Sequence, residues 1–419
     1  MMTAHSLPTP PAKTRRRVLT TLLVVLAAIA LLAGGAIGWS LFSTRAQGTP
    51  DATEFAEAIV SDEIAVATVL ALGEATHGNA EFQFQRLTLV QKLPQFRAIM
   101  LEEDYGNTAL VDAFIQGGPG TAEDAAKRFG FRLNHTVQMA ELLHWLHDHN
   151  AGVPDAERIR IVGVDTQRVD ASKDIALSWL AQHDEAAAEQ LRAQLAGWTD
   201  DSDATDAATT RPVVDELVAA VEATPESDGR AHAVNAATAL SQGLDLASAS
   251  DLDYIAVRAQ IMAANVGRTV EEEAERGNEH SFLFAHNGHV DKASAAFAAK
   301  DLGALLVDEY GDGYRVIGTE VHHSSFITGR GGERWEVSLT NRTPLRGMFD
   351  GTAEGYLEFA TAAPENRELL NRPVRMASAG EGMQQWQAWI PWFNSVEMTP
   401  ETSYDALILV ESATPVTPL

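Results

Sequence analysis

The sequence predicts an α/β fold: a mainly parallel central sheet flanked by helices, with a helical insertion and a single N-terminal transmembrane helix. Short apolar segments rich in β-branched residues alternate with segments of helical spacing, which is typical of a parallel sheet covered by helices on both faces. Between residues 172 and 250 the strand-like segments disappear, and Ala, Asp, Glu and Gln dominate. That stretch predicts the helical insertion. The predicted transmembrane helix rests on residues 18–42, which carry no charge.

The composition excludes several classes of function. The chain has 419 residues, with 31 Lys and Arg against 58 Asp and Glu, so its formal net charge is −27. A surface this acidic repels phosphate backbones, and we expect no nucleic-acid partner. The absence of cysteine removes disulfides, Cys-based zinc sites, iron–sulfur clusters and thiol catalysis. The hydrophobic share of 45% is sufficient for a folded core.

The N-terminal region predicts a membrane association. Residues 1–17 form a leader whose charges are all basic, and residues 18–42 are long enough to span a bilayer, which needs ~20 apolar residues. Basic residues before the span predict that the leader is cytoplasmic and that the main domain lies outside the cell membrane. The alternative is a cleaved export signal, after which the domain is secreted, although the apolar part of such signals is usually ~7–15 residues long.

The remainder of the chain divides into a polar linker, residues 43–53, and one large α/β domain, residues 54–419. The insertion occupies about residues 172–250. Apolar runs predict strands at residues 64–72, 96–101, 158–164, 281–285 and 314–318, and helical spacing predicts helices at 82–93 and 136–149. We expect the C-terminal residues 414–419 to be frayed.

Three of the predicted strands run into polar clusters. These are Gly73-Glu74-Ala75-Thr76-His77-Gly78, Glu102-Glu103-Asp104-Tyr105 and His286-Asn287-Gly288-His289. Taken singly, each cluster could be a capped turn or a solvated loop. In open α/β sheets, however, ligands bind beyond the C-terminal ends of the strands, so the three clusters together predict one cleft. A histidine beside a carboxylate suits general-base catalysis near neutral pH, and a buried arginine or second histidine can stabilise an oxyanion.

Two other mechanisms compete for this cleft. A serine nucleophile is disfavoured because no G-x-S-x-G elbow occurs in the chain. A metal-dependent mechanism stays open, because five side chains are of the types that ligate zinc. They are Glu74, His77, Glu102, His286 and His289. No H-E-x-x-H motif is present, so we expect no cofactor and keep a metal ion as the alternative.

Several segments occur together in this chain. They are GEATHG followed by Glu81 and Arg86, LEEDY at 101–105, WLHDHN at 145–150, GVDTQ at 163–167, Arg258 within VRAQIMAANV, AHNGH at 285–289 and GDGYRVIGTE at 311–320. In combination they resemble the erythromycin esterase family. The likeness runs from about residue 54 to 320 and continues more weakly to the C-terminus.

The resemblance implies a hydrolase that uses no serine, built on an α/β core with a helical subdomain. Members of the family open the macrolactone ring of macrolides with an activated water, so the implied partner is a small-molecule ester or lactone. By the same resemblance His77 is the general base, and Glu74 and Glu102 orient it and the water. His286 and His289 are implied to line the cleft and to position the substrate or its oxyanion.

Four further residues are implied in the cleft by the resemblance. Arg86 lines it as a substrate-binding group. Arg258 matches a family arginine, but Ala259 stands where the family often has an aspartate, so a role that needs this adjacent carboxylate does not carry over. Asp104 and Asp165 are expected to orient neighbouring groups. A protein that binds a cell-envelope or secreted substrate without hydrolysing it is the alternative from another class, although the intact set of histidines and carboxylates favours an enzyme.

Overall fold

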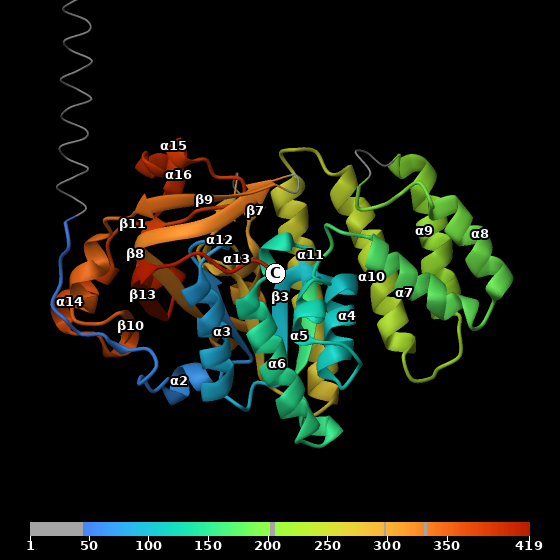
Figure 1. Ribbon diagram of the computed structural model, residues 1–419, viewed down its shortest axis with the longest axis horizontal. Coiled ribbons are helices and arrows are strands. Elements are labelled where there is room, and N and C mark those ends of the chain that lie inside the picture. Colours follow the sequence, from blue (N-terminus) through green and yellow to red (C-terminus); the bar gives the residue numbers. More distant parts are fainter. Residues whose placement is uncertain (1–44, 202–205, 297–298, 331–332) are drawn as a thin grey trace, which may run out of the picture.

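The computed structural model describes residues 45–419, apart from 202–205, 297–298 and 331–332 (Figure 1). Within these residues a nine-stranded sheet forms the centre of the molecule. The strands are β1 (Thr53–Glu54), β2 (Val69–Glu74), β3 (Ala98–Asp104), β4 (Arg160–Asp165), β5 (Ser281–His286), β8 (Tyr314–Arg330), β9 (Glu333–Thr340), β10 (Glu354–Glu358) and β13 (Ala406–Ala413).

The sheet is mixed, and its centre is parallel. Its order is β1-β10-β13-β8-β2-β5-β3-β4, with β9 paired to β8. Every neighbouring pair from β13 to β4 is parallel, whereas β1 with β10, β10 with β13, and β8 with β9 are antiparallel. Consequently the C-terminal ends of β2, β5 and β3 lie side by side.

Helices cover both faces of the sheet. One face carries α3 (Ala80–Lys92), α4 (Tyr105–Ile115), α5 (Ala122–Ala126) and α6 (Val137–Ala151), and the other carries α11 (Tyr254–Glu275), α13 (Leu302–Tyr310) and α14 (Pro364–Leu370). The central strands are therefore apolar at successive positions. In β3, Ile99 and Leu101 enter the first core while Met100 enters the second, because successive side chains of a strand point to opposite faces.

Residues 170–248 form four helices beside the sheet (Figure 1). They are α7 (Asp170–Ala181), α8 (Glu185–Leu195), α9 (Ala207–Glu222) and α10 (Arg230–Ser248). These helices have a hydrophobic core of their own, with Leu177, Leu217 and Leu240 fully buried in it. A separate core allows this part of the chain to extend from the sheet without exposing apolar side chains.

The remaining elements are short. The helices are α2 (Asp62–Ala65), α12 (Asn287–Val290), α15 (Gln385–Ala388), α16 (Pro391–Asn394) and α17 (Pro400–Ser403). Two small antiparallel pairs are β6 (Ala295–Ala296) with β7 (Ala299–Lys300), and β11 (Val374–Ala377) with β12 (Ser395–Met398). The 3₁₀ helices are η1 (Arg132–Asn134), η2 (Asp155–Glu157), η3 (Gly311–Gly313), η4 (Pro344–Phe349) and η5 (Phe359–Thr361).

Two local predictions were wrong. The predicted strand 64–72 begins only at Val69, because Asp62 and Glu63 open the short helix α2, where acidic side chains favour the helix N-terminus. The C-terminal residues are not frayed. The Val416 amide donates to Gly78 O at 3.0 Å and the Leu419 amide donates to His135 O at 3.1 Å. These bonds tie the C-terminal segment to the residues just before α3 and α6.

The predicted transmembrane helix needs correction. Residues 18–42 lie outside the described part of the chain, as does the basic leader. Among the helices of the described residues, none has the length and apolar character that crossing a membrane requires. The fold that the structure supports is therefore a mixed α/β fold with a large sheet. The single-pass membrane location, the signal anchor and the membrane partner predicted from residues 18–42 are without support.

Candidate active site

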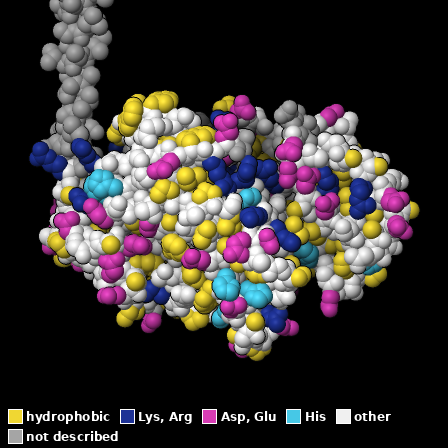
Figure 2. All heavy atoms as spheres, viewed as in Figure 1, with side chains coloured by type: hydrophobic (Ala, Val, Ile, Leu, Met, Phe, Trp, Pro, Cys, Tyr) yellow, Lys and Arg dark blue, Asp and Glu magenta, His cyan; other side chains and the backbone are white. Residues whose placement is uncertain are grey.

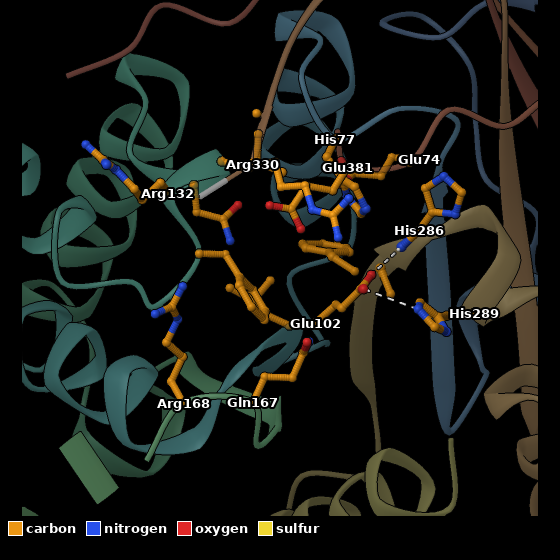
Figure 3. A pocket seen from close by; sticks show the side chains of 18 of the residues that line it. Glu74, His77, Glu102, Arg132, Gln167, Arg168, His286, His289, Arg330 and Glu381 are labelled. Carbon is orange, nitrogen blue, oxygen red and sulfur yellow. Dashed lines mark hydrogen bonds and ion pairs between the residues drawn. The ribbon is translucent and has the colours of Figure 1, made fainter. Parts of the chain in front are cut away.

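The three polar clusters meet at one edge of the sheet. Because β5 lies between β2 and β3, Glu74 at the end of β2 is paired in register with His286 at the end of β5, and Glu102 is on the neighbouring β3. A cavity of about 930 Å³ opens at this edge (Figure 3). Its lining includes Glu74, His77, Arg86, Glu102, Arg258, His286 and His289.

Two glycines of the first cluster permit close packing around the site. A Cβ at Gly78 would lie 1.7 Å from the carbonyl oxygen of Ile327 in β8, and a Cβ at Gly73 would lie 2.2 Å from Oδ1 of Asn287. Asn287 in turn donates from Nδ2 to Thr319 O at 2.7 Å, which fixes the start of α12 against β8. Glycine at these two positions therefore lets the strand ends approach one another.

His77 is held by a buried carboxylate and an arginine. Its Nδ1 lies 2.6 Å from Oε1 of Glu74, and Oε2 of Glu74 accepts from Nη2 of Arg86 at 2.7 Å. Burial alone would raise the pKa of Glu74. The charge of Arg86, and to a smaller extent the hydrogen bond with His77, keeps this pKa below its usual value. Although burial lowers it, the pKa of His77 is raised overall by its hydrogen bond to Glu74. With Nδ1–H directed at Glu74, Nε2 is the nitrogen left to accept a proton.

His286 is a neutral hydrogen-bond donor without a protein partner. The Gly288 amide donates to its Nδ1 at 3.2 Å, so the ring proton resides on Nε2. Nε2 is buried and has no hydrogen-bond partner among the described residues. Burial, together with the neighbouring His77, lowers the pKa of His286 to about 4. The two rings lie 4.9 Å apart, which places this donor beside the base.

Glu102 is ionised and held from several sides. Its Oε1 accepts from Nη2 of Arg258 at 2.8 Å and lies 3.3 Å from Nε2 of His289, and its Oε2 accepts from the His286 amide at 2.9 Å (Figure 3). Burial raises its pKa, but His289 and Arg258 bring it well below the usual value. An extra residue in β3 between Leu101 and Asp104 shifts the register against β4 at this point. Such bulges re-aim side chains near active sites.

His289 lies between two carboxylates, those of Glu102 and Asp301. Burial lowers its pKa, but Glu102 and Asp301 raise it to about 9. Oδ1 of Asp301 lies 3.3 Å from Nδ1, on the other side of the ring from Glu102. The raised pKa of His289 favours the protonated ring, whereas Nη1 of Arg258, which can only donate, lies 3.0 Å from Nε2 and favours the neutral one. Asp301 lies at the start of α13 and carries no motif that would have predicted its contact with His289.

Arg86 and Arg258 line the cavity and use most of their donors on carboxylates, while Nη1 of Arg258 lies 3.0 Å from Nε2 of His289. Arg86 binds Glu74, while Arg258 donates from Nε to Oδ2 of Asp165 at 3.0 Å and from Nη2 to Asp165 and Glu102. Asp165 is fully buried and does not line the cavity. Asp104 is also fully buried, and its Oδ1 accepts from the Arg168 amide at 2.8 Å. Burial raises the pKa of Asp104 well above the usual value.

Glu103 is a residue that the sequence analysis did not single out. Its carboxylate accepts hydrogen bonds from the amides of Asp104, Gly130 and Phe131 and from Nδ2 of Asn134, at 2.9 to 3.1 Å. Phe131 and Asn134 line the cavity, so Glu103 anchors one of its walls. The side chain of Glu103 points away from that of Glu102 because the two are neighbours on a strand.

The described residues contain one group of three histidine and carboxylate ligand atoms within 4.8 Å of one another, namely His322, His323 and Glu411. None of the three lines the cavity. Glu411 already binds Arg346, with Nε at 2.9 Å from Oε2 and Nη2 at 2.5 Å from Oε1. The polar side chains around the cavity are instead hydrogen-bonded to one another. Arg86 donates to Glu74, and Glu74 is hydrogen-bonded to His77.

The cavity thus brings together a histidine paired with a carboxylate, a second histidine with a buried ring nitrogen, and a third histidine between two carboxylates. A sequence profile of the erythromycin esterase family matches residues 94–413. The chain belongs to the erythromycin esterase family. The family resemblance drawn from the sequence motifs is thus confirmed, and the protein is a hydrolase of this family, whose members act on small-molecule substrates.

Solved structures share the fold of this erythromycin esterase family member. A protein from Bacillus cereus has a TM-score of 0.70 and 19% identity over 86% of this chain and 92% of its own. A succinoglycan biosynthesis protein has a TM-score of 0.71 and 16% identity over 85% and 91%. A mutant of the erythromycin esterase EreC in its open conformation has a TM-score of 0.59 and 18% identity over 87% and 97%.

Proposed function

We propose that the protein hydrolyses a carboxylic ester or lactone, such as the macrolactone of a macrolide, with a water activated by His77 and without a metal ion. The observation that carries this proposal is the pairing of His77 with Glu74 beside the unpartnered Nε2–H of His286. Family membership and the structural likeness to an erythromycin esterase support the same reaction class.

The proposed reaction follows from the protonation states of the site. Nε2 of His77 accepts a proton from water, and the hydroxide adds to the ester carbonyl. The Nε2–H of His286 donates to the oxyanion, because the Gly288 amide occupies Nδ1 and leaves the ring proton on Nε2. When the intermediate collapses, the bond between the carbonyl carbon and the alcohol oxygen breaks. The His77 imidazolium, stabilised by Glu74, gives its proton to the departing alkoxide, and the products are an acid and an alcohol.

The cavity supports a substrate larger than a simple ester. Its volume of about 930 Å³ lies near the upper end of the ~300–1,000 Å³ typical of small-molecule sites. A mass-spectrometric screen of the purified protein with macrolides and simple lactones tests the proposal, and a product heavier by one water is the expected result. The screen is repeated after exhaustive chelation. An unchanged rate is expected, whereas activity lost on chelation and restored by zinc would establish the metal-dependent alternative.

The pH dependence of hydrolysis is a specific expectation of this mechanism. His77 must be neutral to accept a proton, and its pKa lies above 6.5. The value of kcat/KM should therefore fall as the pH is lowered, with a midpoint above 6.5. Glu74→Gln removes the group that raises this pKa and leaves burial, which lowers it, so the midpoint should move to lower pH. Initial rates from pH 5 to 9 measure the shift, and an unchanged midpoint in the variant would contradict the assignment.

A further inference from the structure

The mouth of the cavity carries an arginine cluster that the proposed reaction does not use. Arg132, Arg168, Arg330 and Arg334 all line the cavity, and we call them the mouth arginines. They come from separate segments: η1, the loop after β4, the end of β8, and β9. Figure 3 shows Arg132 and Arg168 across the cavity from His286 and His289, so they face a part of the substrate remote from the bond that is cleaved.

Three of these guanidinium groups have donors that the protein leaves unused. Among the residues that the structure describes, neither Arg168 nor Arg330 forms a side-chain hydrogen bond or ion pair, and the charge of Arg168 acts at longer range on the buried Asp104. Nε of Arg334 is buried with no partner in the same part of the chain. Arg334 does donate from Nη2 to the backbone oxygen of Arg132, which keeps two positive residues together. Burial and the charge of Arg132 lower the pKa of Arg334, as expected for neighbouring cations.

Such a cluster is unusual in a chain with a net charge of −27, where carboxylates outnumber basic groups and could have neutralised it. Figure 2 shows Lys and Arg side chains gathered near the centre of one face, although acidic side chains are spread over the same view. Like charges held close together repel one another, and an anionic ligand that accepts their hydrogen bonds offsets that cost.

Acidic side chains also line the mouth, and they could neutralise the arginines by forming ion pairs with them. They are Asp200, Asp201, Glu333 and Glu381. Asp200 is already engaged, since its Oδ1 accepts from the amides of Val169 and Asp170 at 2.6 and 3.0 Å. Within the described residues, none of the four forms an ion pair with Arg168, Arg330 or Arg334. The guanidinium forks therefore remain available to a ligand.

We propose that the substrate carries a carboxylate, or an oxyanion of the same chemistry, which binds to the mouth arginines while the ester lies at His77 and His286. This inference rests on the proposed hydrolysis and narrows its substrates to anionic esters and lactones, so a macrolide without an anionic group should be a poorer substrate than one that carries it. Arginine suits the role because its planar group donates two parallel hydrogen bonds to a carboxylate.

A matched series of esters tests this inference. Three aryl esters share one leaving group, and their acyl chains end in a carboxylate, a methyl ester or a trimethylammonium group. We expect kcat/KM to be roughly tenfold or more higher for the carboxylate than for the methyl ester, since hydrogen bonds between charged groups are the strong ones. The trimethylammonium ester should be the poorest substrate. Equal rates for all three, or a preference for the cation, would overturn the inference.

Variants locate the effect and separate it from catalysis. Arg168→Gln and Arg330→Gln should each reduce the ratio of carboxylate to methyl-ester activity. The control Arg192→Gln, an exposed arginine of α8 that does not line the cavity, should leave that ratio unchanged. A second measurement uses a non-hydrolysable compound, in which an amide replaces the ester of the carboxylate substrate. Its binding to the protein is measured by calorimetry. If no ester is cleaved but this amide binds and Arg168→Gln weakens it, the proposed hydrolysis fails while the anion site stands; if esters are cleaved and neither arginine variant alters the ratio, the anion site fails.

Discussion

His77→Ala should reduce kcat for ester hydrolysis by about 10²- to 10⁴-fold, the range that a positioned general base contributes. The variant removes the acceptor for the proton of water but leaves the cavity wall in place, because the His77 side chain is 24% exposed and supports no core. The rate is measured by initial velocities on whichever ester the screen identifies. The melting temperature should change little.

The matched control for this variant is His144→Ala. His144 lies on α6 with its side chain 71% exposed and does not line the cavity, so neither the rate nor the melting temperature should change. If His77→Ala hydrolysed the substrate at the normal rate, another group would have to be the base. If it lost both activity and its folding transition, the residue would be structural.

His286→Phe should lower kcat by about 10²- to 10³-fold with little change in KM, as for removal of one oxyanion donor. The substitution keeps an aromatic ring beside His77 but removes Nε2–H, the buried donor without a partner. The low-pH midpoint of the rate should stay above 6.5, because His286, with a pKa of about 4, is not the group that titrates there. Steady-state kinetics across pH provide both readouts.

His280→Phe serves as the control on the same segment. His280 lies immediately before β5, at the opposite end of that strand from His286, and packs against Phe96 with ring centres 5.2 Å apart. Its replacement should alter stability rather than kcat. A kcat within about threefold of the native value in His286→Phe would rule out His286 as the oxyanion donor.

Much of the central sheet could be predicted because its strands are short and buried on both faces. The runs at 96–101, 158–164 and 281–285 are short and mostly apolar, and β3, β4 and β5 lie on them with their ends shifted by at most three residues. The candidate site residues also followed from this pattern. Parallel strands place their C-terminal ends at one edge, so polar residues directly after them converge whatever their distance along the chain.

The C-terminal third was less predictable. β8 extends to Arg330, well past the predicted 314–318, because its second half pairs with β9 in an antiparallel extension that has little apolar alternation. The donors at the cavity mouth lie on loops and strand ends without a motif. Their proximity depends on how β8, β9 and the segment around η1 pack together, which no local pattern in the sequence encodes.

The position of β5 between β2 and β3 has a consequence for how the protein folds. β2 and β3 are close in sequence, but the strand that joins them begins at Ser281, after the whole helical region has been passed. Until that strand arrives during synthesis, the facing edges of β2 and β3 have no partner, and open strand edges are sites of misassembly and aggregation. The edge of the sheet that carries the candidate active site is therefore among the last parts to assemble. Folding should be slow because its decisive pairings are non-local.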